Sequence, residues 1–163
     1  MTKTLLIVFH SMTGGTRQMA GAAARAAAAQ GVSVRLLEAQ SAAAADVLAA
    51  DGYLFATPET LAAIAGMMKD FFDRTYYAAL GRIEGRPYAV MVCAGSDGTG
   101  AARQVARIAT GWRLRAVAEP LIVCTRAQTP EAILARKTIG AEDLARCEEL
   151  GAALAAGLAL GVF

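Results

Sequence analysis

Apolar runs that alternate with helical patterns constrain the fold of this chain more than any other feature. Five segments are rich in apolar residues, and we expect strands at Thr4–Phe9, Val32–Leu37, Gly52–Thr57, Tyr88–Cys93 and Ala116–Thr125. All but the second are almost uninterrupted apolar runs, which is typical of strands that are covered on both faces. Strands that alternate with helices indicate a parallel sheet with right-handed crossovers, which is a doubly wound α/β sandwich.

Helical patterns occupy most of the connections between these expected strands. We predict helices at Thr16–Gln30, Leu61–Leu80 and Ala101–Thr110. A last helix is predicted from one line of small and apolar residues, which are Leu144, Cys147, Gly151, Leu154 and Leu158. Thr129-Pro130-Glu131 is a helix-start signal, so a short additional helix is expected after the last strand.

Length and composition limit the class of protein. With 163 residues, the chain is expected to form one domain over residues 1–163. Hydrophobic residues make up 56% and charged residues 18%, so the chain can build a large core and is not a disordered polymer. The net charge of +2 provides no basic field, and we therefore expect no nucleic-acid partner.

The apolar segments and the cysteines indicate the cellular compartment of the protein. The run Leu150–Phe163 is shorter than a bilayer span of about 20 residues, and Leu5–Phe9 is too short for a signal peptide. We therefore expect a cytoplasmic protein with no membrane partner. Cys93, Cys124 and Cys147 contain no CxxC pair and indicate free thiols in a reducing compartment. Because the chain has one histidine, a metal site is not expected.

Three loops are candidates for ligand binding, because ligands of doubly wound sheets lie beyond the carboxyl ends of the strands. The first loop, His10–Arg17, has small and hydroxyl residues that lead directly into a helix. Free backbone N–H groups and the helix dipole at such a start favour a phosphate. The loop lacks the Gly-Lys-Ser/Thr of a Walker motif, which disfavours nucleoside triphosphates.

The segment Ile7–Ala20 resembles the FMN-phosphate signature of the flavodoxin family. The residues that match in register are Val8, Phe9, Ser11, Gly14, Thr16 and Ala20. The resemblance implies a flavodoxin-like three-layer sandwich, with a five-stranded parallel sheet in the order 2-1-3-4-5. It also implies that the phosphate is held by Ser11, Met12, Thr13, Gly14, Gly15 and Thr16.

The second loop and its helix, Ala56–Arg74, resemble the quinone-reductase and FMN-reductase branch of flavodoxin-like proteins. The matching residues are Thr57-Pro58, Gly66, Met68-Lys69, Phe71 and Asp73-Arg74. The charges of Lys69–Arg74 have a second interpretation, as a solvated helix face. The resemblance implies that the flavin ring is framed by Thr57, Pro58, Glu59, Thr60 and Leu61. This branch usually has an aromatic residue followed by Gly-Asn-Met beside the ring, whereas this chain has Thr60–Ile64.

The third loop, Cys93–Gly100, is similar to the third flavin loop in its position and glycine content. The resemblance implies contacts from Cys93, Ala94, Gly95, Ser96 and Asp97. Two of these residues have a second interpretation, Cys93 as a buried thiol at a strand end and Asp97 as a cap of the next helix. His10 is either a proton donor near the flavin or structural. Trp112 precedes the last predicted strand, so we expect it at the opposite end of the sheet, in the core or an interface.

The resemblance implies non-covalently bound FMN, which carries the chemistry, so that no catalytic side chain is expected. The function it favours is an oxidoreductase that uses NAD(P)H to reduce a quinone or a similar acceptor. Two alternatives stay open. One is an electron-transfer flavodoxin, although such carriers are usually acidic and this chain is not. The other is a flavodoxin-like binding protein that has lost FMN, in line with the missing aromatic residue.

Related reductases often assemble so that a neighbouring subunit completes the flavin site. A homo-oligomer is therefore a further hypothesis for this chain. In it, the missing aromatic ring would come from Tyr76, Tyr77 or Trp112 of the neighbour.

Overall fold

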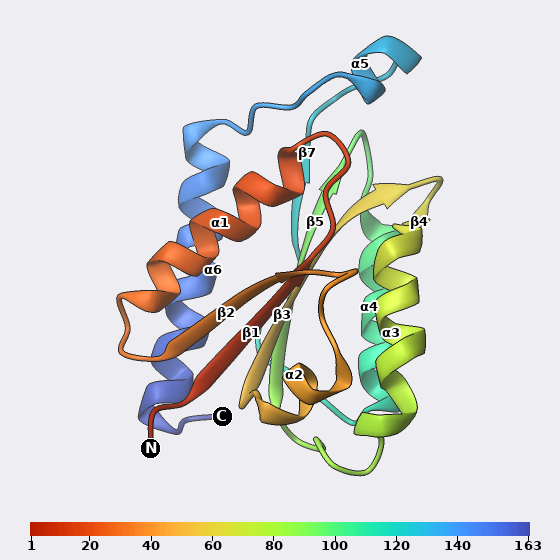
Figure 1. The fold of residues 1–163 in the computed structure, drawn as a ribbon. Helices are drawn as coiled ribbons and strands as arrows, with labels where there is room; N and C mark the ends of the chain where they lie inside the picture. The colour runs from red at the N-terminus through yellow and green to blue at the C-terminus, as the bar shows by residue number, and fades with distance from the viewer.

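A parallel β-sheet forms the centre of the protein in the computed structural model, which describes residues 1–163 (Figure 1). Its main strands are β1 (Thr4–Phe9), β2 (Ser33–Glu38), β3 (Gly52–Thr60), β5 (Pro87–Ala94) and β7 (Leu121–Cys124). Two short strands, β4 (Ala63–Ile64) and β6 (Arg115–Ala116), extend the sheet at β3 and β5. The order runs β2-β1-β3-β5, with β6 and β7 both beside β5, and only β4 is antiparallel to its neighbour.

Helices cover both faces of the sheet (Figure 1). One layer consists of α1 (Gly15–Ala28) and α6 (Ala141–Leu160), and the other of α2 (Ala44–Ala49), α3 (Gly66–Ala79) and α4 (Thr99–Gly111). The short helix α5 (Pro130–Leu134) lies beyond the sheet, on the side where β7 ends. None of these helices combines the length and the apolar character that crossing a membrane requires.

Alternate residues of each strand supply two separate cores. In β1, Leu6 and Val8 pack in the core beneath α3 and α4, while Leu5 and Ile7 pack in the core beneath α1 and α6. Because successive strand side chains point to opposite faces, a strand covered on both sides must be apolar throughout. The observed order and the two helical layers confirm the predicted three-layer α/β sandwich, with β2, β1, β3, β5 and β7 as its five strands.

The last predicted strand, Ala116–Thr125, is divided in the structure. Its first part, β6, pairs with the start of β5, and its second part, β7, pairs with the end of β5. Pro120 lies between them and has no N–H group to donate to the ladder, so the pairing is interrupted there.

Two further differences concern helices. The helix predicted from Leu61 begins at Gly66, because β3 continues to Thr60 and the chain then turns back into β4. Helix α2 was not predicted, since six residues are too few for a clear helical pattern. Its start is stabilised by Asp46, whose carboxylate accepts a hydrogen bond from the N–H of Ala43 at 2.8 Å.

The short helix expected at Thr129-Pro130 is confirmed, and the Thr129 hydroxyl accepts the N–H of Ala132 at 3.2 Å.

Helices α1 and α6 approach each other closely because their facing residues are small. The buried face of α1 consists largely of alanines, including Ala20, Ala23 and Ala27. Opposite them, Gly151 of α6 lies so close that a Cβ atom there would be 2.7 Å from the Cα of Ala23. A real Cβ cannot occupy that space unless one helix moves.

We expect Gly151→Ala to lower the free energy of unfolding by about 1–3 kcal/mol, the usual cost of overpacking a well-packed contact. Urea denaturation of the two proteins measures this difference. The matched control is Gly66→Ala, since no atom lies within 4 Å of a Cβ at the first residue of α3. This control should be neutral or stabilising by up to about 1 kcal/mol. Equal stability of Gly151→Ala and the wild type would contradict the close approach.

Candidate functional site

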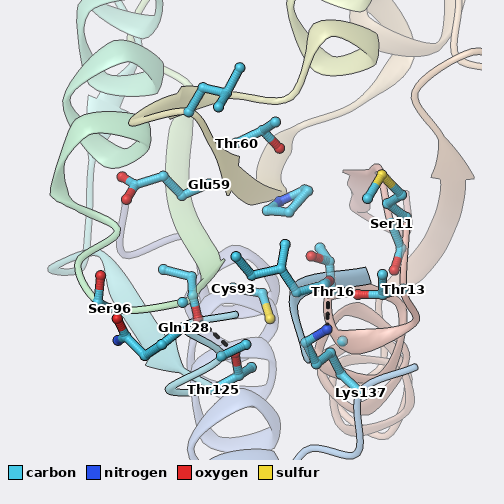
Figure 2. A pocket seen from close by; sticks show the side chains of 18 of the residues that line it. Ser11, Thr13, Thr16, Glu59, Thr60, Cys93, Ser96, Thr125, Gln128 and Lys137 are labelled. Atoms are coloured by element: carbon cyan, nitrogen blue, oxygen red, sulfur yellow. Dashed lines mark hydrogen bonds between the residues drawn. The ribbon is translucent and has the colours of Figure 1, made fainter. Parts of the chain in front are cut away.

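A cavity of about 380 Å³ lies at the carboxyl edge of the sheet (Figure 2). This volume is in the range of small-molecule sites, which is about 300–1,000 Å³. The three segments predicted to bind a ligand, at the ends of β1, β3 and β5, line it together with the segment that follows β7. Among the predicted residues, the lining includes Ser11, Met12, Thr13, Gly15, Thr16, Pro58, Glu59, Thr60, Leu61, Cys93, Ala94, Gly95 and Ser96. Figure 2 shows Ser11, Thr13 and Thr16 on one side of the cavity and Glu59 and Ser96 on the other.

The loop after β1 ends in an uncapped helix start. The Ser11 hydroxyl accepts a hydrogen bond from the N–H of Gly14 at 3.1 Å, which holds the loop in a tight turn. Gly14 has a φ of 94°, a conformation that favours glycine. No side chain caps α1 and no acidic residue lies in its first turn, so its first N–H groups are free to bind an anion.

A segment distant in sequence is fastened onto this loop. The side-chain amide of Gln18 donates to the carbonyl of Gly14 at 3.0 Å and to that of Lys137 at 2.8 Å. Its oxygen accepts the N–H of Ile139 at 3.0 Å, and the Lys137 N–H donates to the Thr13 carbonyl at 2.8 Å. The segment that carries Lys137 therefore forms a wall of the cavity.

Glu59, near the end of β3, joins this strand to the loop after β5. Its carboxylate accepts hydrogen bonds from the N–H groups of Gly98, at 2.9 Å, and Ala101, at 3.1 Å. These groups lie at the start of α4, where a negative charge is favourable. Glu59 therefore lines the cavity, but both of its oxygens are engaged by the protein.

Leu61 and Ala62 form the two-residue turn of a hairpin between β3 and β4. Both have positive φ, 52° and 63°, as a turn of this length requires. The carbonyl of Ala62 lies against Gly100 of α4, where any side chain would collide with it. The N–H of Ile64 also donates to the side chain of Gln104 at 2.8 Å. Because α4 supports the hairpin, Leu61 projects from its tip with its side chain almost fully exposed.

Three predicted residues do not line the cavity. Gly14 lines a neighbouring hollow instead, together with Arg17 and Arg136. Thr57 is buried and is used internally, since its hydroxyl donates to the Pro58 carbonyl at 2.8 Å and accepts the N–H of Ala65 at 3.2 Å. Asp97 lies just before α4, where its carboxylate accepts the backbone N–H of Thr99 at 3.3 Å and the Thr99 hydroxyl at 2.8 Å, which agrees with its interpretation as a cap of this helix.

Sequence reasoning missed the part of the lining that follows the hairpin tip and β7. The missed residues are Ala62, Thr125, Ala127, Gln128, Ile133 and Lys137. The predicted helix start at Thr129-Pro130 was the one local signal in this stretch. It shows that a helix begins there, but not that the segment after it reaches the loop of β1.

Comparison with known proteins decides the family. The sequence pattern of the NADPH-dependent FMN reductase family matches residues 38–125, which is more than half of the chain. The protein belongs to this family. It is a flavodoxin-like flavoprotein of the oxidoreductase class. No curated protein matches the sequence significantly.

Solved structures show the same fold as this FMN reductase family member. A flavodoxin from the domain Archaea has a TM-score of 0.77 and 17% identity, covering 95% of this chain and 98% of that one. A flavodoxin of Streptococcus pneumoniae has a TM-score of 0.74 and 24% identity, covering 94% and 98%. A WrbA-like flavodoxin of Agrobacterium tumefaciens has a TM-score of 0.65 and 18% identity, covering 94% and 96%.

The residues of the cavity fit the FMN that the family name implies. An uncapped helix start and the hydroxyls of Ser11, Thr13 and Thr16 form a neutral donor set that suits a phosphate. On the other side, the small residues Ala94, Gly95 and Ser96 line the cavity, and Gly95 packs against the segment after β7, where a Cβ would lie 3.1 Å from the carbonyl of Ala127.

No aromatic residue lines the cavity of this family member. Trp112 is completely buried, stacks on Tyr76 with ring centres 5.6 Å apart, and donates its Nε1–H to the Tyr76 carbonyl. Its predicted place in the core is therefore confirmed, and the hypothesis that it completes a neighbour's site is wrong. The side chain of Tyr77 is 82% exposed, so its contribution to a neighbour stays a prediction.

Cys93 and His10 have shifted pKa values. Burial raises the pKa of the Cys93 thiol to about 11, although the Lys137 charge and a hydrogen bond with Thr16 act in the opposite direction. The interpretation of Cys93 as a buried thiol is confirmed, and Cys93 also lines the cavity. Partial burial lowers the pKa of His10, while the Glu38 charge raises it. His10 does not line the cavity, which favours its structural interpretation.

We expect Glu59→Gln to lower the free energy of unfolding by about 1–3 kcal/mol, because a neutral amide can accept at only one of its two atoms. Chemical denaturation measures the effect. The matched control is Glu84→Gln, an exposed loop residue, which should change stability by less than about 0.5 kcal/mol. Similar effects for the two variants would contradict the capping role of Glu59.

The raised pKa of Cys93 predicts slow alkylation. With a pKa of about 11 instead of the ordinary 9.0, its thiolate fraction at pH 8 is about a hundredfold lower. Its reaction rate with iodoacetamide, followed by peptide mass spectrometry, should therefore keep rising with pH to about 11. The half-buried Cys124 serves as the internal comparison and should react faster at pH 8. A plateau of the Cys93 rate near pH 9 would contradict the assignment.

Proposed function

We propose that this protein is an FMN-dependent oxidoreductase that takes electrons from NAD(P)H and reduces quinones or similar acceptors. The observation that carries the proposal is the uncapped start of α1, where Ser11–Thr16 border a cavity at the carboxyl edge of the sheet. This is where the phosphate of a mononucleotide would bind, and the cavity continues between the other two loops. The family match to NADPH-dependent FMN reductases supports both the cofactor and the donor.

In this proposal, each of the three loops has its own role. Ser11–Thr16 bind the phosphate through backbone N–H groups and hydroxyls. Pro58–Leu61 and Ala94–Ser96 border the ring and contact it through backbone groups and small side chains. FMN, when bound, supplies the chemistry of hydride and electron transfer. The protein binds and orients it, and no side chain has to act as an acid or a base.

The rim of the cavity suits an apolar, planar acceptor. Three large apolar side chains that line the cavity are also exposed to solvent: Leu61 at 96%, Met12 at 63% and Ile133 at 47%. Single exposed apolar side chains are ordinary on a protein surface, but several that gather at one site mark a contact with a ligand or a partner. A quinone ring would bury part of them when it approaches the flavin.

Two other functions follow from the same fold. An electron-transfer flavodoxin would use the same phosphate loop, but the net charge of +2 gives no acidic surface to steer it to basic partners. A binding protein that has lost FMN would account for the missing aromatic residue. It would not account for the uncapped helix start beside an open cavity, which is an arrangement that suits a phosphate. We therefore favour the reductase.

Turnover tests this proposal. Protein loaded with FMN should oxidise NADPH or NADH when a water-soluble quinone is present, with a kcat on the order of 1–10³ s⁻¹. Thr13→Val should need a higher FMN concentration for the same maximal rate, because it removes one hydroxyl from the phosphate loop. The matched control, Thr110→Val, removes an exposed hydroxyl that donates to its own helix at Ala106.

Two results would contradict the proposal. If the protein binds FMN but oxidises neither NADPH nor NADH, an electron carrier is favoured. If it binds no FMN, the binding-protein alternative is favoured.

A further inference from the structure

Lys137 is the one cationic residue among those that line the cavity. It lies on the segment between α5 and α6, and its N–H donates to the Thr13 carbonyl at 2.8 Å. Its Cβ is 3.5 Å from the place that a Cβ on Gly15 would occupy. The side chain therefore starts directly beside the first residue of α1, and Figure 2 shows it next to Thr13 and Thr16.

The ammonium group of Lys137 has no acidic partner. Its Nζ donates to the carbonyl of Ile133 at 2.8 Å and to that of Ala135 at 2.5 Å, both in or next to α5. None of the six ion pairs of the structure includes Lys137. The acidic residue of the cavity, Glu59, has both oxygens engaged at the start of α4. The positive charge of Lys137 is therefore not neutralised within the protein.

A phosphate at the start of α1 would be a better partner for Nζ than these carbonyls. The present bonds of Nζ to the carbonyls have one charged partner, whereas a phosphate would bring an opposite charge to Nζ in addition to a hydrogen-bond acceptor. The lysine side chain has a flexible stem of four carbons, so Nζ can move while the backbone N–H of Lys137 stays bonded to the carbonyl of Thr13. The charge already acts at the cavity, where it is one of the influences on the Cys93 thiol.

We propose that Lys137 is a phosphate ligand of this site: its Nζ leaves the carbonyls of Ile133 and Ala135 and donates to the phosphate held at Ser11–Thr16. This rests on the proposed function and deepens it, because the site then selects phosphorylated flavins over riboflavin by charge as well as by hydrogen bonds. The transfer also couples binding to the segment after β7, since α5 loses two hydrogen bonds when the phosphate gains one.

The neighbouring residue provides a matched control. Arg136 has the same charge but does not line the cavity; it lines a neighbouring hollow together with Gly14 and Arg17. A general electrostatic attraction would involve both residues to a similar degree. Direct contact with the phosphate would involve Lys137 alone.

The test compares FMN and riboflavin binding, by quenching of flavin fluorescence, in the wild type, Lys137→Gln and Arg136→Gln. We expect Lys137→Gln to weaken FMN binding about tenfold or more and to leave riboflavin binding within about twofold. Arg136→Gln should change FMN binding less than about threefold. Lys137→Arg, which keeps the charge, should retain most of the FMN affinity. Thermal unfolding of the flavin-free variants checks that each is folded.

Three outcomes would overturn the assignment of Lys137 while leaving the proposed function intact. They are unchanged FMN binding in Lys137→Gln, equal losses in Lys137→Gln and Arg136→Gln, and equal losses of FMN and riboflavin in Lys137→Gln. If the wild type binds neither flavin, the proposed function itself fails, and the role of Lys137 fails with it.

Discussion

The free N–H groups at the start of α1 are the feature on which the rest of the site depends. β1 is an inner strand that ends at the carboxyl edge of the sheet, so α1 begins at this edge, and no side chain caps it. The protein stabilises the turn that leads there, through Ser11 and Gly14, but leaves the helix start itself without a partner. Such a start is stabilised when an anion binds, which gives the fold a built-in preference for a phosphate-bearing ligand.

Polar contacts hold the loops around the cavity in one arrangement. Glu59 links β3 to the start of α4, Gln104 links α4 to β4, and Gln18 links α1 to the segment that carries Lys137. Each of these bonds joins residues that are far apart in sequence but lie at the same edge of the sheet. A site supported in this way is largely formed before a ligand arrives, so less ordering is required on binding.

The sequence predicts the strands, the layers and most of the lining of the cavity, because apolar runs and helix starts are local signals. It does not predict the hairpin at Leu61 and Ala62, since neither glycine nor asparagine marks its positive φ values. Thr57 was assigned to the cavity from its place in a loop pattern, but its hydroxyl is used by the backbone of Ala65. Lys137 could not be found from sequence, because its position depends on hydrogen bonds to Thr13 and Gln18, more than a hundred residues earlier.

The most direct test of this account is to observe the backbone amides at the start of α1 while flavin is added. Amide resonances of Gly14, Gly15 and Thr16 in isotope-labelled protein report binding at these groups by NMR. We predict that FMN shifts them strongly, and that riboflavin, which lacks the phosphate, shifts them far less. If FMN binds and leaves these amides unchanged, or if riboflavin shifts them equally, the start of α1 is not the phosphate site and the central claim is wrong.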